Sequence, residues 1–207
     1  MGLTADQLRT ALDVLAKTEP AFAAALARVG YPEPRIRERG YATLLRTIIG
    51  QQVSTKAAQS VWNKLEGLVG SLDDPGNITR ATDEQLREAG LSRQKASYAR
   101  SLADEVTSGR LDFANLPADD EEAVAALVRI KGIGRWSAEV YLLFAEGRGD
   151  IWPAGDLAVQ IEVGRILGHE ARPSEKLTRE LAEAWRPHRG AAAIFAWYHY
   201  GSDMQVI

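Results

Sequence analysis

A glycine pair near the middle of the chain has the spacing best suited to bind an anion. In the run RIKGIGRWSA, Gly132 and Gly134 interrupt apolar helical periodicity on both sides. Glycine adopts positive φ without a Cβ penalty, so the pair permits a sharp turn between two helices and leaves the backbone N–H groups of the turn uncovered. Together with Lys131, Arg135 and the N-terminus of the helix that starts near Arg135, those amides favour phosphate as the ligand.

The same pattern also fits a plain corner between two helices that binds nothing. The two flanking cations shift the balance toward phosphate, and phosphate contacts position a protein on DNA without reading its sequence. We expect the preceding helix to stop at Lys131, and we expect Ile133, between the glycines, to plug back into the core.

Composition excludes several other chemistries. The chain has 207 residues and no cysteine, which excludes disulfides, thiolate zinc sites and cysteine-ligated iron–sulfur clusters. Its three histidines show no metal-ligand spacing, so we expect them to be ordinary surface or packed residues: His169, His188 and His199. Neither a membrane-spanning apolar stretch nor a secretory signal is recognisable, which predicts an intracellular protein.

The net charge of −3 by itself argues against a nucleic-acid partner. However, residues 28–64 carry seven Lys or Arg and two acidic residues, whereas acidic residues gather elsewhere, as at residues 119–122. This distribution allows a basic face on an acidic protein. From charge alone, a solvated surface of mixed charge is the favoured explanation.

The elements that must position the glycine turn are predicted to be helices throughout. Apolar stripes at helical spacing occur along the chain: Leu8, Leu12 and Leu15; Ala58, Val61, Trp62 and Leu65; Ala99, Leu102, Ala103 and Val106; Val124, Leu127 and Val128. Thr4 with Gln7 and Thr82 with Gln85 have capping-box spacing, and Gly90 stands where a helix would end. The stretch IIGQQV has some character of a strand, but no convincing alternating strand bounded by turns is present. Proline and glycine turn signals separate roughly ten predicted helices. The sequence predicts an all-α fold.

Five motifs, in order, resemble the helix–hairpin–helix (HhH-GPD) DNA glycosylase superfamily. LVRIKGIGRWSA resembles its hairpin, and IWPAGDLAV resembles its Gly/Pro-rich loop that ends in an aspartate. The stretches LLRTIIGQQVSTKAA, GLSRQKASY and WRPHRGAAAIFAWYHYG also match the family pattern, so that the resemblance spans residues 35–201. The segment GIGRWSA is similar to the corresponding segment of the DNA-3-methyladenine glycosylase II branch.

The resemblance implies a DNA glycosylase that initiates base excision repair after flipping the damaged nucleotide out of the stack. Asp156 would be the catalytic carboxylate that stabilises an oxocarbenium-like sugar and orients or deprotonates the attacking water. From the residues alone, Asp156 fits a helix N-cap, a role compatible with catalysis. Trp136 stands where bifunctional members have a lysine nucleophile, so the resemblance implies a monofunctional hydrolase without AP lyase activity.

The resemblance also assigns the residues that contact DNA and the base. Trp136, Trp197 and Tyr198 would line the base pocket, where aromatic faces attract cationic alkylated purines such as 3-methyladenine and 7-methylguanine. For Trp197 and Tyr198, simple packing in the last helix remains the alternative. Gln52 would fill the gap left by the flipped base, with Gln51 beside it. The other expected DNA contacts are Lys131, Gly132, Ile133, Gly134, Arg135 and Ser137 at the hairpin, and Ser92 and Lys95 at another helix start.

The predicted architecture is two helical lobes with an interlobe cleft that holds Asp156. Residues 41–148 would form the central lobe, and residues 1–40 with 149–207 the other. The resemblance implies no required cofactor, although main-chain carbonyls of Val128, Ile130 and Ile133 could hold Na⁺ or K⁺. The expected partner is double-stranded DNA with alkylated bases. We expect a monomer that is not secreted and that is cytoplasmic and nucleoid-associated, or nuclear.

Two alternatives remain open at this point. The hairpin could belong to a non-catalytic DNA-binding module, which would need neither the PAGD turn nor the aromatic residues. A glycosylase/lyase that uses a different lysine is the other alternative. The lesion range is also open, from cationic adducts only to hypoxanthine, etheno bases, N1-methyladenine and N3-methylcytosine.

Overall fold

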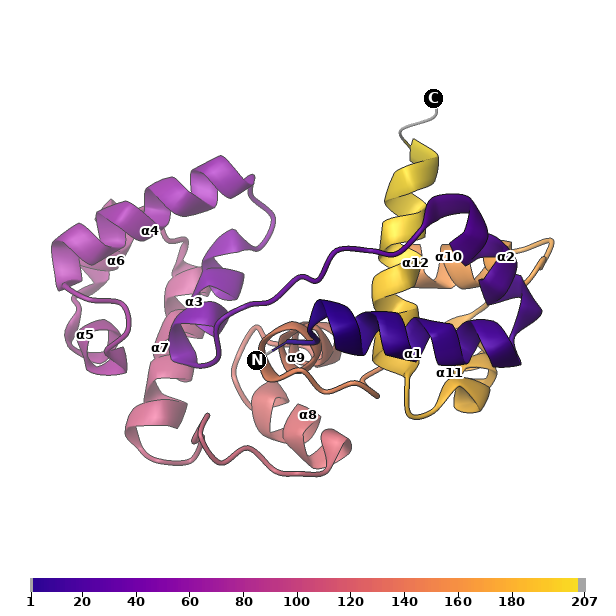
Figure 1. The fold of residues 1–207 in the computed structure, drawn as a ribbon. Helices are drawn as coiled ribbons and strands as arrows, with labels where there is room; N and C mark the ends of the chain where they lie inside the picture. The colour runs from indigo at the N-terminus through magenta and orange to yellow at the C-terminus, as the bar shows by residue number, and fades with distance from the viewer. Residues whose placement is uncertain (1, 205–207) are drawn as a thin grey trace. The chain divides into compact units, whose positions relative to one another are not determined.

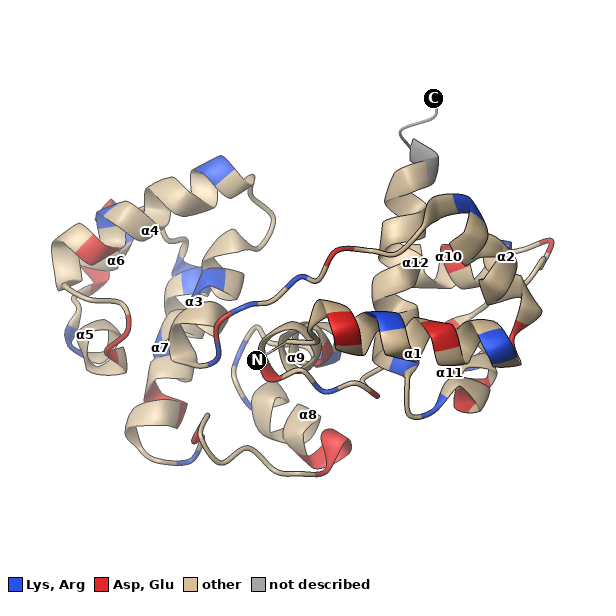
Figure 2. Ribbon diagram, viewed as in Figure 1, with Lys and Arg blue, Asp and Glu red and all other residues tan. Residues whose placement is uncertain are grey.

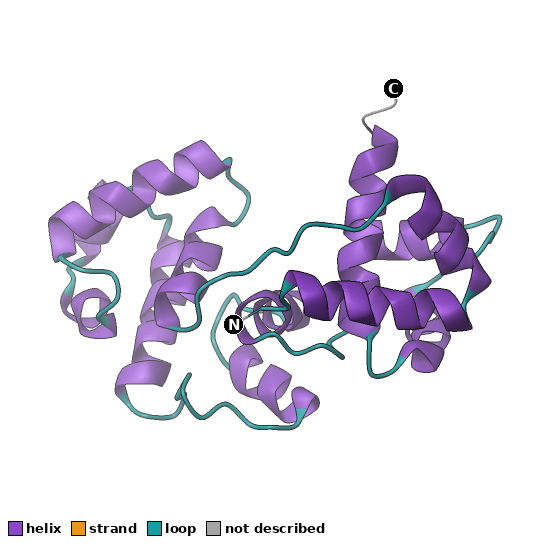
Figure 3. Ribbon diagram, viewed as in Figure 1, coloured by secondary structure: helices purple, strands orange, loops and turns teal. Residues whose placement is uncertain are grey.

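A computed structural model describes residues 2–204, and every regular element in that range is helical (Figure 1, Figure 3). The prediction of an all-α fold is therefore confirmed. The α-helices of the described range are α1 (Ala5–Thr18), α2 (Pro20–Val29), α3 (Tyr41–Gly50), α4 (Thr55–Val69), α5 (Pro75–Arg80), α6 (Asp83–Glu88), α7 (Arg93–Thr107), α8 (Asp120–Val128), α9 (Arg135–Tyr141), α10 (Leu157–Ile166), α11 (Glu175–Ala182) and α12 (Arg189–Met204). A π-helical turn (Leu142–Glu146) directly follows α9, and a 3₁₀ turn (Glu183–Trp185) precedes α12.

The chain divides into two compact units, which are described separately below. The central unit is the continuous segment Arg37–Tyr141, and the terminal unit combines Met1–Ile36 with Leu142–Ile207. The boundaries predicted from the sequence, after residues 40 and 148, lie a few residues further along the chain. The structure thus places the π-helical turn in the terminal unit.

The terminal unit starts with a helix whose cap was predicted from local sequence. Thr4 Oγ1 accepts a hydrogen bond from Gln7 N, and Gln7 Oε1 accepts one from Thr4 N, so the predicted capping box is present. Helix α1 buries its predicted stripe of Leu8, Leu12 and Leu15 against α2 and α12. Burial of each leucine stabilises the fold by roughly 1.5–3 kcal/mol, which holds α1 on the last helix.

Aromatic rings fill the rest of the terminal core. The Trp185 ring centroid lies 5.0 Å from that of Phe22 and 5.5 Å from that of Trp152, both in edge-to-face geometry. Phe195, on α12, packs against Phe22 as well. Helices α10 and α12 pack against each other, so the start of α10 is fixed by a well-filled core.

Helix α7 is the central support of the other unit, where it packs against α3, α5 and α6. It buries Ala99, Leu102 and Ala103 from its predicted stripe. The short helix before it has the predicted capping box of Thr82 and Gln85, and Gly90 follows it with φ 100°. Gly40 N donates to the Tyr141 hydroxyl, which ties the start of α3 to the end of α9.

Two local expectations were wrong. Helix α8 ends at Val128 and not at Lys131, because Ile130 turns into the core and breaks the helical path. Val128, which was predicted to belong to the buried stripe, is 41% exposed, while Val124 and Leu127 are buried. The stretch IIGQQV lies at the end of α3 and in the turn after it. In the part of the chain described here, no helix has the length and apolarity needed to cross a membrane.

Candidate functional site

The hairpin between α8 and α9 needs its first glycine for structural reasons. Ile133 N donates to the Ile130 carbonyl oxygen at 3.0 Å, which closes a reverse turn with Gly132 at φ 82°. A Cβ added at Gly132 would lie 2.1 Å from the Tyr98 ring. Side-chain volume and backbone conformation therefore both require glycine here. Ile133 is buried, which confirms that it plugs into the core.

The second glycine has no comparable structural reason. Gly134 does not adopt positive φ, and a Cβ added there would meet no described atom within 4 Å apart from its own chain neighbours. The expectation that both glycines serve the turn is thus wrong for Gly134. Its backbone precedes α9 and is open on the side where a Cβ would stand. That opening leaves room for a ligand to approach the amides, as the phosphate hypothesis requires.

The two cations beside the hairpin differ in their surroundings. Lys131 is exposed, and its backbone N donates to Ser101 Oγ on α7 at 3.0 Å. The Arg135 guanidinium instead pairs with both Glu121, through two hydrogen bonds, and the buried Glu139. These two carboxylates raise the pKa of Arg135. The positive charge of Arg135 is therefore compensated by carboxylates within the fold. Lys131 is left as the cation beside the hairpin that a phosphate could meet.

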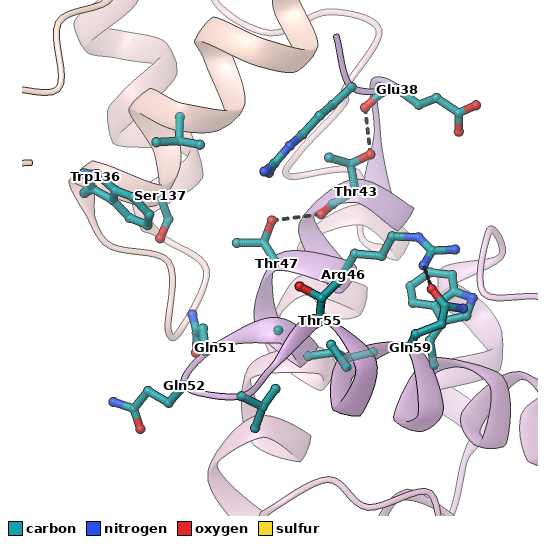
Figure 4. A pocket seen from close by; sticks show the side chains of 17 residues that line it. Glu38, Thr43, Arg46, Thr47, Gln51, Gln52, Thr55, Gln59, Trp136 and Ser137 are labelled. Atoms are coloured by element: carbon teal, nitrogen blue, oxygen red, sulfur yellow. Dashed lines mark hydrogen bonds between the residues drawn. The ribbon is translucent and has the colours of Figure 1, made fainter. Parts of the chain in front are cut away.

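The turn after α3 carries the two glutamines of the GQQV motif. Gln52 is exposed and has φ 56°, a left-handed conformation that is uncommon for a residue with a side chain. Gln51 Nε2 donates to the Gly132 carbonyl oxygen at 2.8 Å, so this side chain links the α3 turn to the hairpin. Figure 4 shows Gln52 extending away from the ribbon beside Gln51. Gln51 was expected to contact DNA, and the structure gives it an internal partner.

A pocket of about 830 Å³ opens beside this turn in the central unit (Figure 4). Trp136 and Ser137, at the start of α9, line it together with side chains of α3 and α4. Trp136 is 48% exposed, which leaves much of its indole available for contact. The Arg46 guanidinium lies 3.6 Å from the Trp62 ring centroid within the same lining, a cation–π contact.

Asp156 begins α10, and its carboxylate is held in place by two donors. Asp156 Oδ1 accepts hydrogen bonds from Val159 N at 3.0 Å and from Trp197 Nε1 at 3.1 Å. The first bond confirms the predicted N-cap. The second comes from α12 and fixes the carboxylate relative to an aromatic side chain.

An aromatic pocket of about 240 Å³ in the terminal unit is lined by Trp197, the side chain that donates to Asp156. Its apolar wall includes Trp197, Phe144 and Tyr198. The Phe144 and Trp197 rings are 5.6 Å apart and inclined by 31°. Tyr198 Oη donates to the Val29 carbonyl oxygen at 2.8 Å, so Tyr198 also ties α12 to α2. Trp136 lies in the central unit. That it lines one base pocket together with Trp197 and Tyr198 remains a prediction.

Ser92 and Lys95, which were expected to contact DNA at the start of α7, both have hydrogen-bond partners within the protein. Ser92 caps the helix by accepting from Lys95 N. Lys95 Nζ donates to the Ile49 carbonyl oxygen at 2.7 Å, at the end of α3. Burial lowers the pKa of Lys95, because removal from water disfavours the ammonium. Lys95 thus links α7 to α3 in this structure.

The carbonyls expected to hold a monovalent cation lie around the hairpin. The Ile130 carbonyl oxygen accepts one hydrogen bond from Ile133 N and retains a second lone pair. Among the described residues, no group of three His, Cys, Asp or Glu side chains could hold a metal ion. A cation at this turn would therefore depend on main-chain oxygens.

A buried polar chain that no sequence pattern predicted joins α10 to α12. Glu162 and His199 are both buried, and His199 Nδ1 is hydrogen-bonded to Glu162 Oε2. Arg28 donates to His199 Nε2, and Arg165 pairs with the other Glu162 oxygen at 2.7 Å. The only sequence signal was a glutamate on the apolar side of residues 157–166.

Comparisons with known proteins agree with these features. The model of the HhH-GPD superfamily base excision DNA repair proteins matches residues 45–187. The chain is similar to DNA-3-methyladenine glycosylase 1 of Schizosaccharomyces pombe, with 29% identity over 165 residues that cover 78% of this chain and 72% of that protein. It is also similar to DNA-3-methyladenine glycosylase 2 of Escherichia coli, with 29% identity over 191 residues, 86% of this chain and 65% of that protein.

Solved structures show the same likeness. A DNA-3-methyladenine glycosidase from Bacillus halodurans has a TM-score of 0.87 and 30% identity, with 94% of this chain and 91% of that chain covered. The S. pombe 3-methyladenine DNA glycosylase in complex with abasic DNA has a TM-score of 0.76 and 28% identity, with 94% and 97% covered. Because the family model matches more than half of the chain, this chain belongs to the HhH-GPD superfamily of base excision DNA repair proteins.

Proposed function

We propose that this protein is a monofunctional DNA glycosylase that excises alkylated bases of the 3-methyladenine and 7-methylguanine type. The observation that carries this proposal is the Asp156 carboxylate, held by Val159 N and by Trp197 Nε1, whose ring lines an aromatic pocket. Its partner is double-stranded DNA that contains an alkylated base. The relatives named as 3-methyladenine DNA glycosylases support the choice of substrate.

The proposed reaction hydrolyses the bond between the base and C1′ of its deoxyribose. As that bond breaks, the base leaves with the bonding electron pair and the sugar develops positive charge. Asp156 stabilises this charge and orients the attacking water, whose oxygen bonds to C1′. The proton that this water loses passes to the Asp156 carboxylate and then to solvent. Two hydrogen bonds to one oxygen restrict rotation of the carboxylate, so it is preorganised before the substrate enters.

Aromatic faces supply the proposed recognition of the base. A purine alkylated at N3 or N7 is cationic, and an indole face attracts it by about 0.5–2 kcal/mol. Trp136, Trp197 and Tyr198 are the proposed contacts. Since 2 kcal/mol is roughly a thirtyfold preference, much of the selectivity must come from the weakened glycosidic bond of the cationic substrate itself.

The enzyme is proposed to lack AP lyase activity. Trp136 occupies the position of the lysine that forms a Schiff base in bifunctional members, and an indole cannot act as that nucleophile. Borohydride treatment during the reaction should trap no covalent DNA adduct. A trapped adduct would support the alternative of a lyase that uses another lysine.

A monovalent cation at the carbonyls of Val128, Ile130 and Ile133 is part of the proposal, not a requirement for the chemistry. Those carbonyls would hold it, and it would supply positive charge at the hairpin that favours a DNA phosphate there. Na⁺ or K⁺ should then tighten binding to DNA relative to tetramethylammonium at equal ionic strength. We further propose a monomer that acts in the cytoplasm at the nucleoid, or in the nucleus.

The proposal is tested by release of free base from methylated DNA by the wild type and by Asp156→Asn. Asparagine also caps helices, so the variant should fold and bind DNA while base release falls by about 10²–10³-fold. Asp119→Asn is the matched control, because Asp119 caps α8 in the same way. Full base release by Asp156→Asn would remove this carboxylate from the mechanism. Absence of release by the wild type would favour a non-catalytic DNA-binding module.

A further inference from the structure

A polar groove of about 990 Å³ runs along α7 in the central unit, outside the aromatic pockets and the α3 turn. Helix α6, one face of α7 and the start of the hairpin form its walls. Arg93, Ser97 and Ser101 all line it, at the spacing of one helical face. The Ser101 hydroxyl accepts a hydrogen bond from Lys131 N, so the hairpin and α7 form one connected surface.

The acidic residues that line this groove are all paired with arginines. Asp83 Oδ1 lies 2.7 Å from Arg100, and Asp104 pairs with Arg110. Glu105 pairs with Arg110 at 3.0 Å and with Arg129 at 3.2 Å. Their negative charges are thus compensated inside the fold.

Within the described chain, two basic residues of the groove lack such a partner, and a third has only a weak, solvent-exposed one. Among the described residues, no carboxylate lies within 4.0 Å of the Arg93 or Lys131 cation. Arg87 approaches Glu84 only at 3.8 Å, and both side chains are more than 70% exposed, so water and salt screen that pair. The groove therefore presents positive charge from its α6 wall to the hairpin.

The position of Arg93 is unfavourable for the helix that carries it. Arg93 is the first residue of α7, where the helix dipole repels cations, and no acidic residue stands in that turn. In Figure 2, basic residues lie near the N-terminal end of α7 and acidic residues near its C-terminal end. The helix dipole favours the reverse distribution of charge. Helix stability does not explain this cation, whereas an anionic ligand does.

We propose that this groove is a second track for DNA phosphates, which continues the grip of the hairpin on the same strand. From Arg93 to Ser101, α7 covers about 12 Å, the length over which one strand of B-form DNA presents roughly three to four phosphates. Arg93 and Arg87 contact the backbone, and the Ser97 hydroxyl adds a neutral donor. At the C-terminal end of α7, Asp104 and Glu105 are paired with arginines, so that end offers no free positive charge among the described residues and the track ends there. This inference rests on the proposed action on DNA.

The experiment measures binding of the full chain to an undamaged duplex, by fluorescence anisotropy, over a series of salt concentrations. Arg93→Gln should reduce the slope of log K against log salt by about 0.9, the value for one phosphate contact. Arg93→Lys should restore the slope. Lys64→Gln is the control, because it removes an exposed cation of the same unit that lies outside the groove. The control should leave the slope unchanged.

A slope for Arg93→Gln equal to those of the wild type and Lys64→Gln would overturn the proposal. Circular dichroism checks folding, and removal of a cation from the start of α7 should not lower helicity. Single-turnover base release at saturating enzyme separates the two hypotheses. Release by the wild type with an unchanged slope refutes only the groove, whereas absent release with a reduced slope refutes only the glycosylase activity.

Discussion

Gln52 holds a backbone conformation that glycine would adopt more easily. A non-glycine residue at φ 56° is less stable than glycine by about 1 kcal/mol. The side chain is exposed, so its burial contributes little that would offset this cost. Strained positions of this kind concentrate at functional sites, which agrees with the proposed insertion of Gln52 into DNA.

Replacement of Gln52 by glycine should separate stability from function. Gln52→Gly should leave the free energy of unfolding unchanged or raise it by up to about 1 kcal/mol, because the strain disappears. Base release from methylated DNA should fall about tenfold or more, since nothing fills the gap left by the flipped base. Urea denaturation and a single-turnover assay measure the two effects. Retained activity in a stabilised variant would contradict the proposed role.

The two hairpin glycines should respond differently to the same change. Gly132→Ala should lower the free energy of unfolding by at least about 1–3 kcal/mol, because φ is positive and the new Cβ meets the Tyr98 ring. Gly134→Ala should leave stability nearly unchanged but weaken DNA binding, because the methyl group would stand where the DNA backbone approaches. Thermal unfolding and duplex binding of both variants test this contrast. Equal DNA binding by Gly134→Ala and the wild type would count against phosphate contact there.

At the scale of elements, α10 and α12 are joined by two polar links. Asp156 is bonded to Trp197, and further along the same helices Glu162 is bonded to His199. The second link is buried, so its geometry is tightly defined. We expect it to hold the two helices in the register that the first link needs.

His199→Phe should therefore destabilise the protein and loosen the carboxylate at the start of α10. Loss of this partner leaves the buried Glu162 with Arg165 alone, which should lower the free energy of unfolding by about 3 kcal/mol. Glu162→Leu combined with His199→Phe should recover part of that loss, since both polar groups are then removed. A double-mutant cycle by urea denaturation measures the coupling. Additive effects would show that the two side chains do not act as a pair.

At the scale of the whole molecule, the two units differ in how the chain builds them. The central unit is one continuous segment with its own buried core, whereas the terminal unit needs segments from both ends of the chain. Local, continuous units fold with a smaller loop-closure cost. The hairpin and Gln52 belong to the continuous unit, and Asp156 belongs to the other.

The segment Arg37–Tyr141 should accordingly fold when expressed alone. We expect a helical circular dichroism spectrum, a cooperative thermal transition and weak, salt-dependent binding to undamaged duplex DNA. It should release no base, because it lacks Asp156. The segment 142–207 alone is the comparison, and it should not unfold cooperatively, since its helices lose α1 and α2. A non-cooperative transition for Arg37–Tyr141 would contradict the independence of this unit.

The sequence by itself determined the features that depend on neighbours within a few residues. Helix starts at Thr4, Thr82 and Asp156 follow from side chains that reach the backbone three positions later. Most positions of the apolar stripes lie on the buried face of their helix, and the hairpin turn follows from Gly132 between such stripes. These interactions are local, so the spacing of residue types is enough to predict them.

Only the tertiary structure decided which polar side chains have internal partners. Gln51 meets a carbonyl 81 positions away, Lys95 one that is 46 positions away, and Trp197 a carboxylate 41 positions away. Arg135 and Arg93 look alike in sequence, yet the fold pairs the first with two carboxylates and leaves the second facing a groove. Many charged residues could form such pairs with similar energy. The path of the chain through the packed cores selects among them, and no local pattern records that path.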